Sequence, residues 1–252
     1  MNLIASLQKE IMEQWRTSRL VVLLVVLGFF GMASPLLAKF MPQLFGLLPG
    51  GEQFVGLIPS PEIKDAIDQY IKNIGQFAIL LAIFLSMGVV VQEKERGTAV
   101  MMLCKPLGRG TFLLAKFLAL AFSFLVSLAV AGLSGFWYTV FLFEAPQAGA
   151  WLSLNLLIWI YCLVYVAITL LASTLVRSQA AAAGISFGVL LVLGILGSLP
   201  GLGQYLPGQL VTWGANLFFN PGNPSWIALA VSGGIILVCL LAAWLVFRGQ
   251  EL

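Results

Sequence analysis

Long apolar runs, separated by short polar stretches, dominate the pattern of this chain. A helix needs about 20 consecutive apolar residues to cross a bilayer. Six windows meet that length: about 20–38, 75–92, 112–143, 151–176, 179–199 and 225–247. The pattern therefore predicts an all-α integral membrane protein, in which residues 1–252 form a single six-span domain.

The windows differ in the details of their sequence. The third is long enough to tilt or break, and Gly132 and Gly135 are its expected weak points. Only the sequence Arg-Ser-Gln separates the fourth window from the fifth, which predicts a tight helical hairpin. In the fifth, Gly184 and Gly188 follow a run of alanines. Small residues at this spacing are typical of close helix packing in membranes.

Residues 1–19 precede the first window and predict an amphipathic helix rather than a span. Apolar residues recur at intervals of three or four, and polar residues occupy the other positions. The apolar set is Ile4, Leu7, Ile11 and Trp15, and the polar set is Gln8, Lys9, Glu13 and Arg16. We expect this helix to lie in the cytoplasmic membrane interface, as a lipid anchor or as a docking element.

Two longer connections are expected on the outer side. Residues 39–74 form a loop that ends in a helix, with Ser60 as its cap and Pro61 at its first position. That helix should continue into the second span, with Gly75 as a flex point. Residues 200–224 lack charge and are rich in Gly, Pro and aromatic residues, which favours short re-entrant or interfacial pieces.

Composition and charge support a membrane protein and orient it. Hydrophobic residues make up 60% of the chain and charged residues only 9%, against roughly 25% in soluble domains. Lys and Arg stay on the cytoplasmic side of membranes. Three of the 13 basic residues fall in the expected outer segments, namely Lys39, Lys64 and Lys72. We therefore expect both termini to be cytoplasmic. We also expect the protein to lie in the cell membrane of a bacterium or archaeon. The first window exceeds the length of a cleaved signal core.

Several functional classes are disfavoured. A net charge of +3 without a basic stripe gives no reason to expect nucleic acid as a partner. There is no histidine, and three widely spaced cysteines predict neither a disulfide framework nor a metal centre. The sequence Gly-Ile-Ser-Phe-Gly around Ser186 resembles a nucleophile elbow but has no base, and we expect no lysine inside a span to activate it. We predict no cofactor and no catalytic site.

The remaining ionisable residues suggest that energy comes from elsewhere. The pairs Glu93/Glu95 and Asp65/Asp68 lie near lysines, and we interpret them as solvated. The sequence Pro-Leu-Gly-Arg-Gly-Thr-Phe lacks the Gly-Lys-Ser/Thr ending of a phosphate loop. A secondary transporter usually binds its coupling ion through ionisable residues inside the bilayer, and we find none well inside a span. A Na⁺ site built from backbone carbonyls and hydroxyls stays an alternative. We therefore expect the energy for any uphill transport to come from outside the chain.

Residues 90–117 combine dense charge with a short apolar insert. Their distinctive elements are Glu93, Gly97, Thr98, the run 100–103, Pro106, Arg109, Leu113 and Lys116. In this order the elements resemble the coupling loop of the type-two ATP-binding-cassette (ABC) exporter permeases, and the six-span layout is similar to that family as well. An apolar insert with flanking charges also suits a soluble partner.

The resemblance implies a permease driven by a separate ATPase that docks on a coupling loop at 93–111. It implies two permease subunits, identical or different, and two ATPase subunits. The implied docking residues are Glu93, Glu95, Arg96, Gly97, Thr98, Met101, Met102, Leu103, Pro106 and Arg109. The spans facing any pathway would be apolar and aromatic, with hydroxyls such as Ser123 and Ser173. That surface would suit an amphipathic or lipid-like molecule better than a small ion, although an ordinary packed helix bundle has the same composition. Two alternatives stay open: an ordinary cytoplasmic loop lying on the membrane, and a non-transporting anchor or assembly factor.

Overall fold

The computed structural model describes residues 3–46, 60–95, 108–219, 222 and 224–249, and these residues form helices and turns without strands. The elements are α1 (Leu3–Arg16), α2 (Arg19–Gly46), α4 (Ile63–Ser86), α5 (Val91–Glu95), α7 (Arg109–Leu142), α8 (Ala148–Leu175), α9 (Gln179–Ser198), the 3-10 turn η1 (Gly203–Tyr205), α10 (Gly208–Phe219) and α11 (Trp226–Gly249). Six helices among the described residues are long and apolar enough to cross a membrane, which confirms the predicted fold class.

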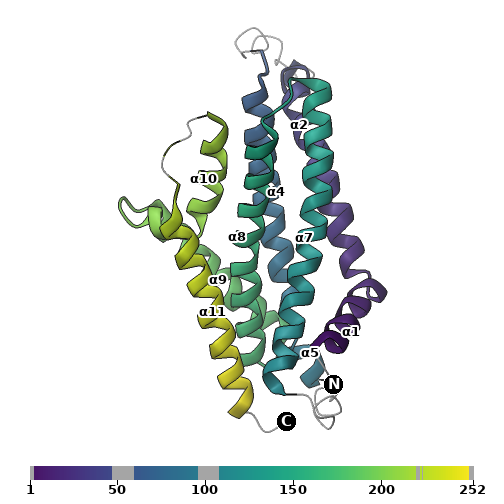
Figure 1. Ribbon diagram of the computed structural model, residues 1–252, viewed down its shortest axis with the longest axis vertical. Coiled ribbons are helices and arrows are strands. Elements are labelled where there is room, and N and C mark those ends of the chain that lie inside the picture. The colour runs from purple at the N-terminus through teal and green to yellow at the C-terminus, as the bar shows by residue number, and fades with distance from the viewer. Residues whose placement is uncertain (1–2, 47–59, 96–107, 220–221, 223, 250–252) are drawn as a thin grey trace.

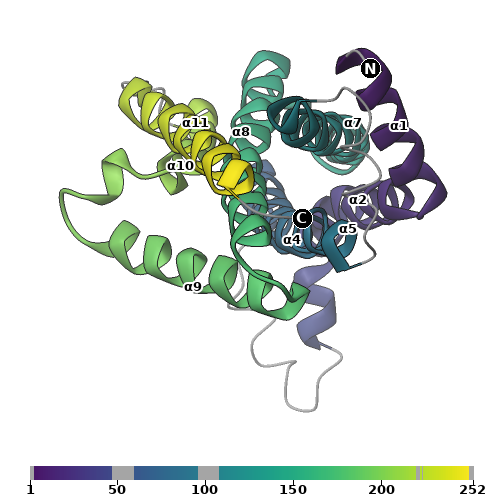
Figure 2. The same cartoon turned by 90° about the horizontal axis from the view of Figure 1, so that it is seen from below.

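The core of the molecule is a bundle of α4, α7 and α8, with α2 packed along α7 and α4 (Figure 1). In the most apolar window of α8, 72% of the residues are buried, and in those of α4 and α7 the share is 61%. By contrast, α9 and α11 bury only 11% and 17%. Figure 2 shows α9 standing apart along one edge of the bundle. Most of its surface therefore faces away from the chain's own core.

Glycines let the core helices approach one another closely. A Cβ added at Gly135 would lie 2.7 Å from the Tyr70 ring and 3.1 Å from Trp151. Beside this contact the Tyr70 hydroxyl donates to Asn155 Oδ1 at 2.6 Å, and Trp151 Nε1 donates to the Gly132 carbonyl at 2.9 Å. The prediction that Gly132 and Gly135 weaken the third span is wrong. The helix α7 is continuous through both, because their missing side chains admit neighbouring groups instead of loosening the backbone.

Helical structure extends further into the 39–74 region than the hydropathy pattern suggested. Helix α2 continues to Gly46 with Pro35 and Pro42 inside it, since side chains and neighbouring helices re-satisfy freed backbone groups in membrane helices. Helix α4 begins at Ile63, and the Glu62 amide donates to Asp65 Oδ2 at 2.9 Å. The cap is therefore Glu62 rather than Ser60. The helix does run into the second span, without a break at Gly75.

The charge-free region before the last span contains η1 and α10. Helix α10 packs on α8, and a Cβ at Gly214 would lie only 2.6 Å from the Leu154 side chain. In Figure 1, α10 lies beside the end of α8 that is remote from α1. The helix α1 and the C-terminal end of α11 lie at the same end of the bundle. Whether α10 enters the membrane from outside stays a prediction.

Candidate functional site

Three of the ten predicted docking residues lie in the described part of the chain: Glu93 and Glu95 on α5, and Arg109 at the start of α7. The others lie outside the described residues, namely Arg96, Gly97, Thr98, Met101, Met102, Leu103 and Pro106. Glu95 is exposed. Glu93 is 8% exposed. The interpretation of Glu93 as a solvated carboxylate is therefore wrong.

Glu93 is buried because it joins an ion cluster centred on Lys116. The Lys116 ammonium donates to Glu93 Oε1 at 2.6 Å and to Glu10 Oε2 at 3.0 Å, and the lysine side chain is only 2% exposed. Since its partners come from α5 and α1, the cluster joins three separate helices. Lys116 also lies within a candidate spanning helix, which contradicts the expectation that no span contains a lysine.

Lys9 covers the open side of this cluster. Its ammonium lies 3.2 Å from Glu10 Oε1, 3.4 Å from Glu13 Oε2 and 3.8 Å from Glu93 Oε1. Burial lowers the pKa of Lys9, but the neighbouring Glu10, Glu93 and Glu13 carboxylates outweigh it, so the net pKa is raised. A raised pKa keeps Lys9 cationic at neutral pH, and its stabilising contribution is lost only above the ordinary lysine pKa of 10.5.

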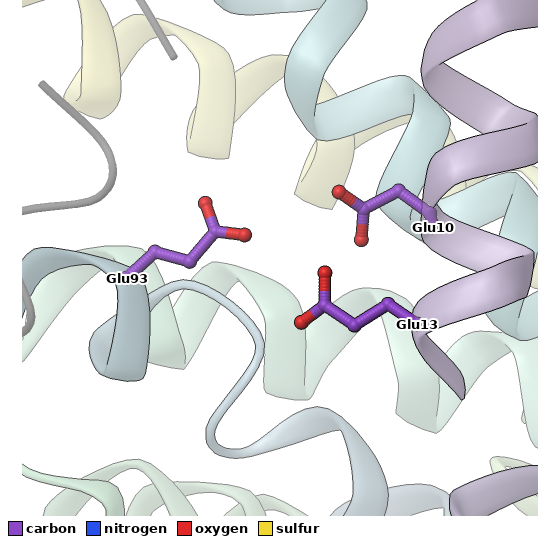
Figure 3. A group of neighbouring side chains, drawn as sticks. All are labelled: Glu10, Glu13 and Glu93. Carbon is purple, nitrogen blue, oxygen red and sulfur yellow. The ribbon is translucent and has the colours of Figure 1, made fainter. Parts of the chain in front are cut away.

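Figure 3 shows the three carboxylates of Glu10, Glu13 and Glu93 turned toward one another. One oxygen of each lies within 4.8 Å of the others, a spacing that a metal ion could bridge. The ammonium groups of Lys9 and Lys116 already contact these oxygens, so the cluster has its own cations. We therefore interpret the group as an internal ion network and not as a metal centre.

Helix α1 meets the bundle through its polar side. Its buried residues are Ser6, Glu10 and Gln14. The Ser123 hydroxyl on α7 donates to Gln14 Oε1, about two helical turns along α7 from Lys116. The apolar residues Ile4 and Trp15 are 69% and 60% exposed. Outward-facing apolar residues on an amphipathic helix agree with the predicted position in a membrane interface.

The residues just before the undescribed 96–107 segment also contact three other helices. Gln92 accepts a 2.7 Å hydrogen bond from Arg19 of α2 and donates one of 3.2 Å to Gln179 of α9. The amides of Val90 and Val91 both donate to the Ser173 hydroxyl of α8 at 3.2 Å. Residues 90–93 thus contact α1, α2, α7, α8 and α9, which makes them the junction of this end of the bundle.

Arg109, on the other flank of the segment, holds the end of the last helix. Its Nη1 donates to the carbonyls of Phe247 at 2.8 Å and Arg248 at 2.7 Å. Carbonyls in the last turn of a helix have no partner within it, and a cation there also offsets the negative end of the helix dipole. Arg109 therefore joins the start of α7 to the end of α11.

The described residues offer no arrangement for hydrolytic chemistry. Ser186 is buried in α9 and its hydroxyl donates to the Ala182 carbonyl at 2.8 Å, while Lys116 is held by two carboxylates. Ser123 and Ser173, which we expected to suit a substrate pathway, are fully buried and bond within the protein. Gly184 and Gly188 are exposed, and a Cβ at either would meet no atom within 4 Å, so they pack against nothing in the described chain.

Sequence reasoning missed Glu10 and Gln92, and it gave Lys116 only a place in a motif. A signal for the cluster was present in the sequence. Ser6, Glu10 and Gln14 recur every four residues on one face of an otherwise amphipathic helix. Lys116 interrupts a continuous apolar run, where a charge requires a buried partner. No signal of this kind distinguishes Gln92, because exposed glutamines are common.

Comparison with known proteins places this arrangement in a family. Residues 4–252 match the ABC-2 family transporter proteins. Over 250 residues the chain is 24% identical to the uncharacterized transmembrane protein YxlG of Bacillus subtilis, covering 98% of this chain and 96% of that protein. Over 163 residues it is 31% identical to the probable ABC transporter permease protein NosY of Stutzerimonas stutzeri, covering 58% and 56%. Since the family match extends over nearly the whole six-helix chain, this protein belongs to the ABC-2 family of transporter proteins.

Proposed function

We propose that this chain is the permease subunit of an ABC exporter in a prokaryotic cell membrane. It forms the translocation pathway, and a separate ATPase docks on its 93–111 loop and supplies the energy. Family membership supports the permease role. The observation that carries the docking assignment is the position of the loop: residues 90–93 contact five helices, and Arg109 holds a sixth.

The charge distribution supports the proposed orientation. Arg16, Lys94, Arg109 and Arg248 belong to elements at the end of the bundle where α1 lies (Figure 1). Basic residues favour the cytoplasmic side, so this end faces the cytoplasm and an ATPase can reach it. The region of η1 and α10 then lies on the outer side, as a re-entrant segment.

Six spans form half of a pathway, so a second permease subunit completes it. The small-residue face of α9 is our candidate for the contact. Gly184 and Gly188 lie on it with open space around them, and the helix buries only 11% of its apolar window. Small residues allow close approach of a helix from a second copy. Two ATPase subunits complete the assembly.

The docking loop can be tested with the double substitution Met102→Asp and Leu103→Asp. Buried carboxylates in an apolar contact have a high desolvation cost, so the partner ATPase should no longer co-purify. The matched control exchanges the same two side chains, Met102→Leu with Leu103→Met, and keeps the contact apolar. Retention of the ATPase by the Asp variant would show that this loop is not the docking site.

A further inference from the structure

The Lys116 cluster has a geometry that topology and docking do not require. Glu93 lies on the chain before the 96–107 segment and Lys116 lies after it, yet their charged atoms are 2.6 Å apart. Glu10, 3.0 Å from the same ammonium, belongs to α1 at the beginning of the chain. One buried cation therefore ties the two flanks of the segment to each other and both of them to α1.

The burial of these groups makes the connection a stiff one. Charge-assisted hydrogen bonds are shorter and stronger than neutral ones, and a buried charge that loses its partner is strongly disfavoured. The Glu10 and Lys116 side chains are 7% and 2% exposed, so water cannot readily replace either partner. A second bond, from Ser123 to Gln14, holds α1 to the same face of α7. Helix α1 should consequently follow any movement of the loop's flanks.

We propose that Lys116 is a positioning residue that couples the ATPase-docking loop to α1. When the ATPase moves the loop, Glu93, Lys116 and Glu10 move as one unit and shift α1 within the membrane interface. This inference rests on the proposed function. The ion cluster gives it a mechanism: the apolar face of α1 contacts lipid, while its polar face is fixed to the loop.

The experiment follows α1 in the intact complex with its co-purified ATPase. A reporter cysteine replaces the exposed Trp15, and Cys104 is changed to serine, which leaves the buried Cys162 and Cys239. The rate of maleimide labelling is compared between nucleotide-free complex and complex trapped with ATP and vanadate. In the otherwise unaltered protein, we expect the labelling rate to change on trapping.

The decisive variant removes all three charges together, as Lys116→Met with Glu10→Gln and Glu93→Gln. Neutral groups of similar shape often replace a buried ion pair without unfolding the protein, whereas single removal strands a charge. Glu93 is only 8% exposed and is held by Lys116, so its carboxylate does not belong to the docking surface. This variant should therefore still bind the ATPase and lose the ATP-dependent change in labelling. Lys116→Arg keeps the charge and should keep the change. Lys72→Met, an exposed lysine on α4, should behave like the parent protein.

The outcomes separate this inference from the proposed function. A triple variant that binds the ATPase and still shows the ATP-dependent change would overturn the coupling role of Lys116. The inference would also fail if the Trp15→Cys labelling rate of the parent complex were the same with and without trapped nucleotide. That result would leave the proposed permease function standing. If no ATPase co-purifies with the parent protein at all, it is the proposed function that fails.

Discussion

Lys116 is the residue that organises the end of the molecule where α1 lies. It has two carboxylate partners from other helices, and Lys9 balances part of the remaining negative charge. Desolvation and attraction nearly cancel in such a cluster, so its net stabilisation is small. Its contribution is specificity, because it fixes where α1 and α5 lie relative to α7.

Removal of this one cation should be far more harmful than removal of the whole cluster. Lys116→Met leaves Glu10 and Glu93 facing each other without their shared ammonium, and the expected loss of stability is about 3–5 kcal/mol. The triple variant with Glu10→Gln and Glu93→Gln should recover most of that loss. Unfolding of detergent-purified protein by a stronger denaturing detergent measures both.

Lys72→Met is the control for this comparison, since exposed substitutions change stability by about 0.5 kcal/mol or less. If Lys116→Met were as mild as Lys72→Met, the ion cluster would not hold this end of the bundle together. Equal losses in the single and triple variants would mean that packing, and not the stranded charge, sets the cost.

The sequence identifies the charged residues of the site but not their partners. Family resemblance drew attention to Glu93 and Lys116 as separate motif positions, and their 2.6 Å contact requires the fold. Glu10 is 83 positions away from Glu93 along the chain, and only the return of α4 to the end where α1 lies brings both to the cation near the start of α7. Local pattern rules describe neighbours within a helix, so they cannot supply such a contact.

At the scale of elements, glycines divide into two groups with different roles. Gly135 accommodates Tyr70 and Trp151 inside the bundle, where an added Cβ would lie 2.7 Å from the Tyr70 ring. Gly184 and Gly188 have no neighbour within 4 Å of that position. The first role belongs to the fold of one chain. The role of Gly184 and Gly188 agrees with a helix surface that packs closely against a second copy of the chain.

Replacement of each glycine by leucine distinguishes these two roles. Gly188→Leu should leave the stability of the single chain within about 0.5 kcal/mol of the parent, because it meets open space, yet it should weaken dimerisation. Gly135→Leu should destabilise the single chain by about 1–3 kcal/mol or more, since it overfills a packed contact. Unfolding measures the first property, and the proportion of dimer in native mass spectrometry measures the second.

The comparison would go against our assignment if Gly188→Leu left the dimer unchanged. A second check is disulfide cross-linking through Gly188→Cys, with Leu133→Cys as the control on the exposed side of α7, where Leu133 is 73% exposed. Efficient cross-linking at position 133 and none at position 188 would indicate that the dimer interface lies on the α7 side of the bundle and not on α9.

Hydropathy predicted the six spanning helices because each apolar run is close to the roughly 20 residues that a helix needs to cross the bilayer core. It could not give the ends of α2 and α4, since helices continue past the membrane wherever tertiary contacts hold them. Lys39, which ended the first window, lies over the Phe143 ring at 4.9 Å and stays within α2. The cap of α4 is Glu62 and not the predicted Ser60, because the Asp65 carboxylate accepts a hydrogen bond from the Glu62 amide.

For the whole molecule, the contacts converge on one end. Residues 90–93 and Arg109 flank a single segment and together contact the six helices α1, α2, α7, α8, α9 and α11. A partner that moves this segment would therefore act on most of the bundle at once. This arrangement suits a permease whose energy arrives from a separate subunit, in a family of ABC transporter proteins.

The most direct test of this account is the composition of the complex that the intact chain forms. The chain is expressed with an affinity tag in its native cells, purified in mild detergent and weighed by native mass spectrometry. We predict a complex of two permease subunits and two ATPase subunits. The ATPase activity of this complex should be inhibited by vanadate. A chain that purifies without any nucleotide-binding subunit, alone or with a partner that lacks ATPase activity, would contradict the account and favour a membrane anchor.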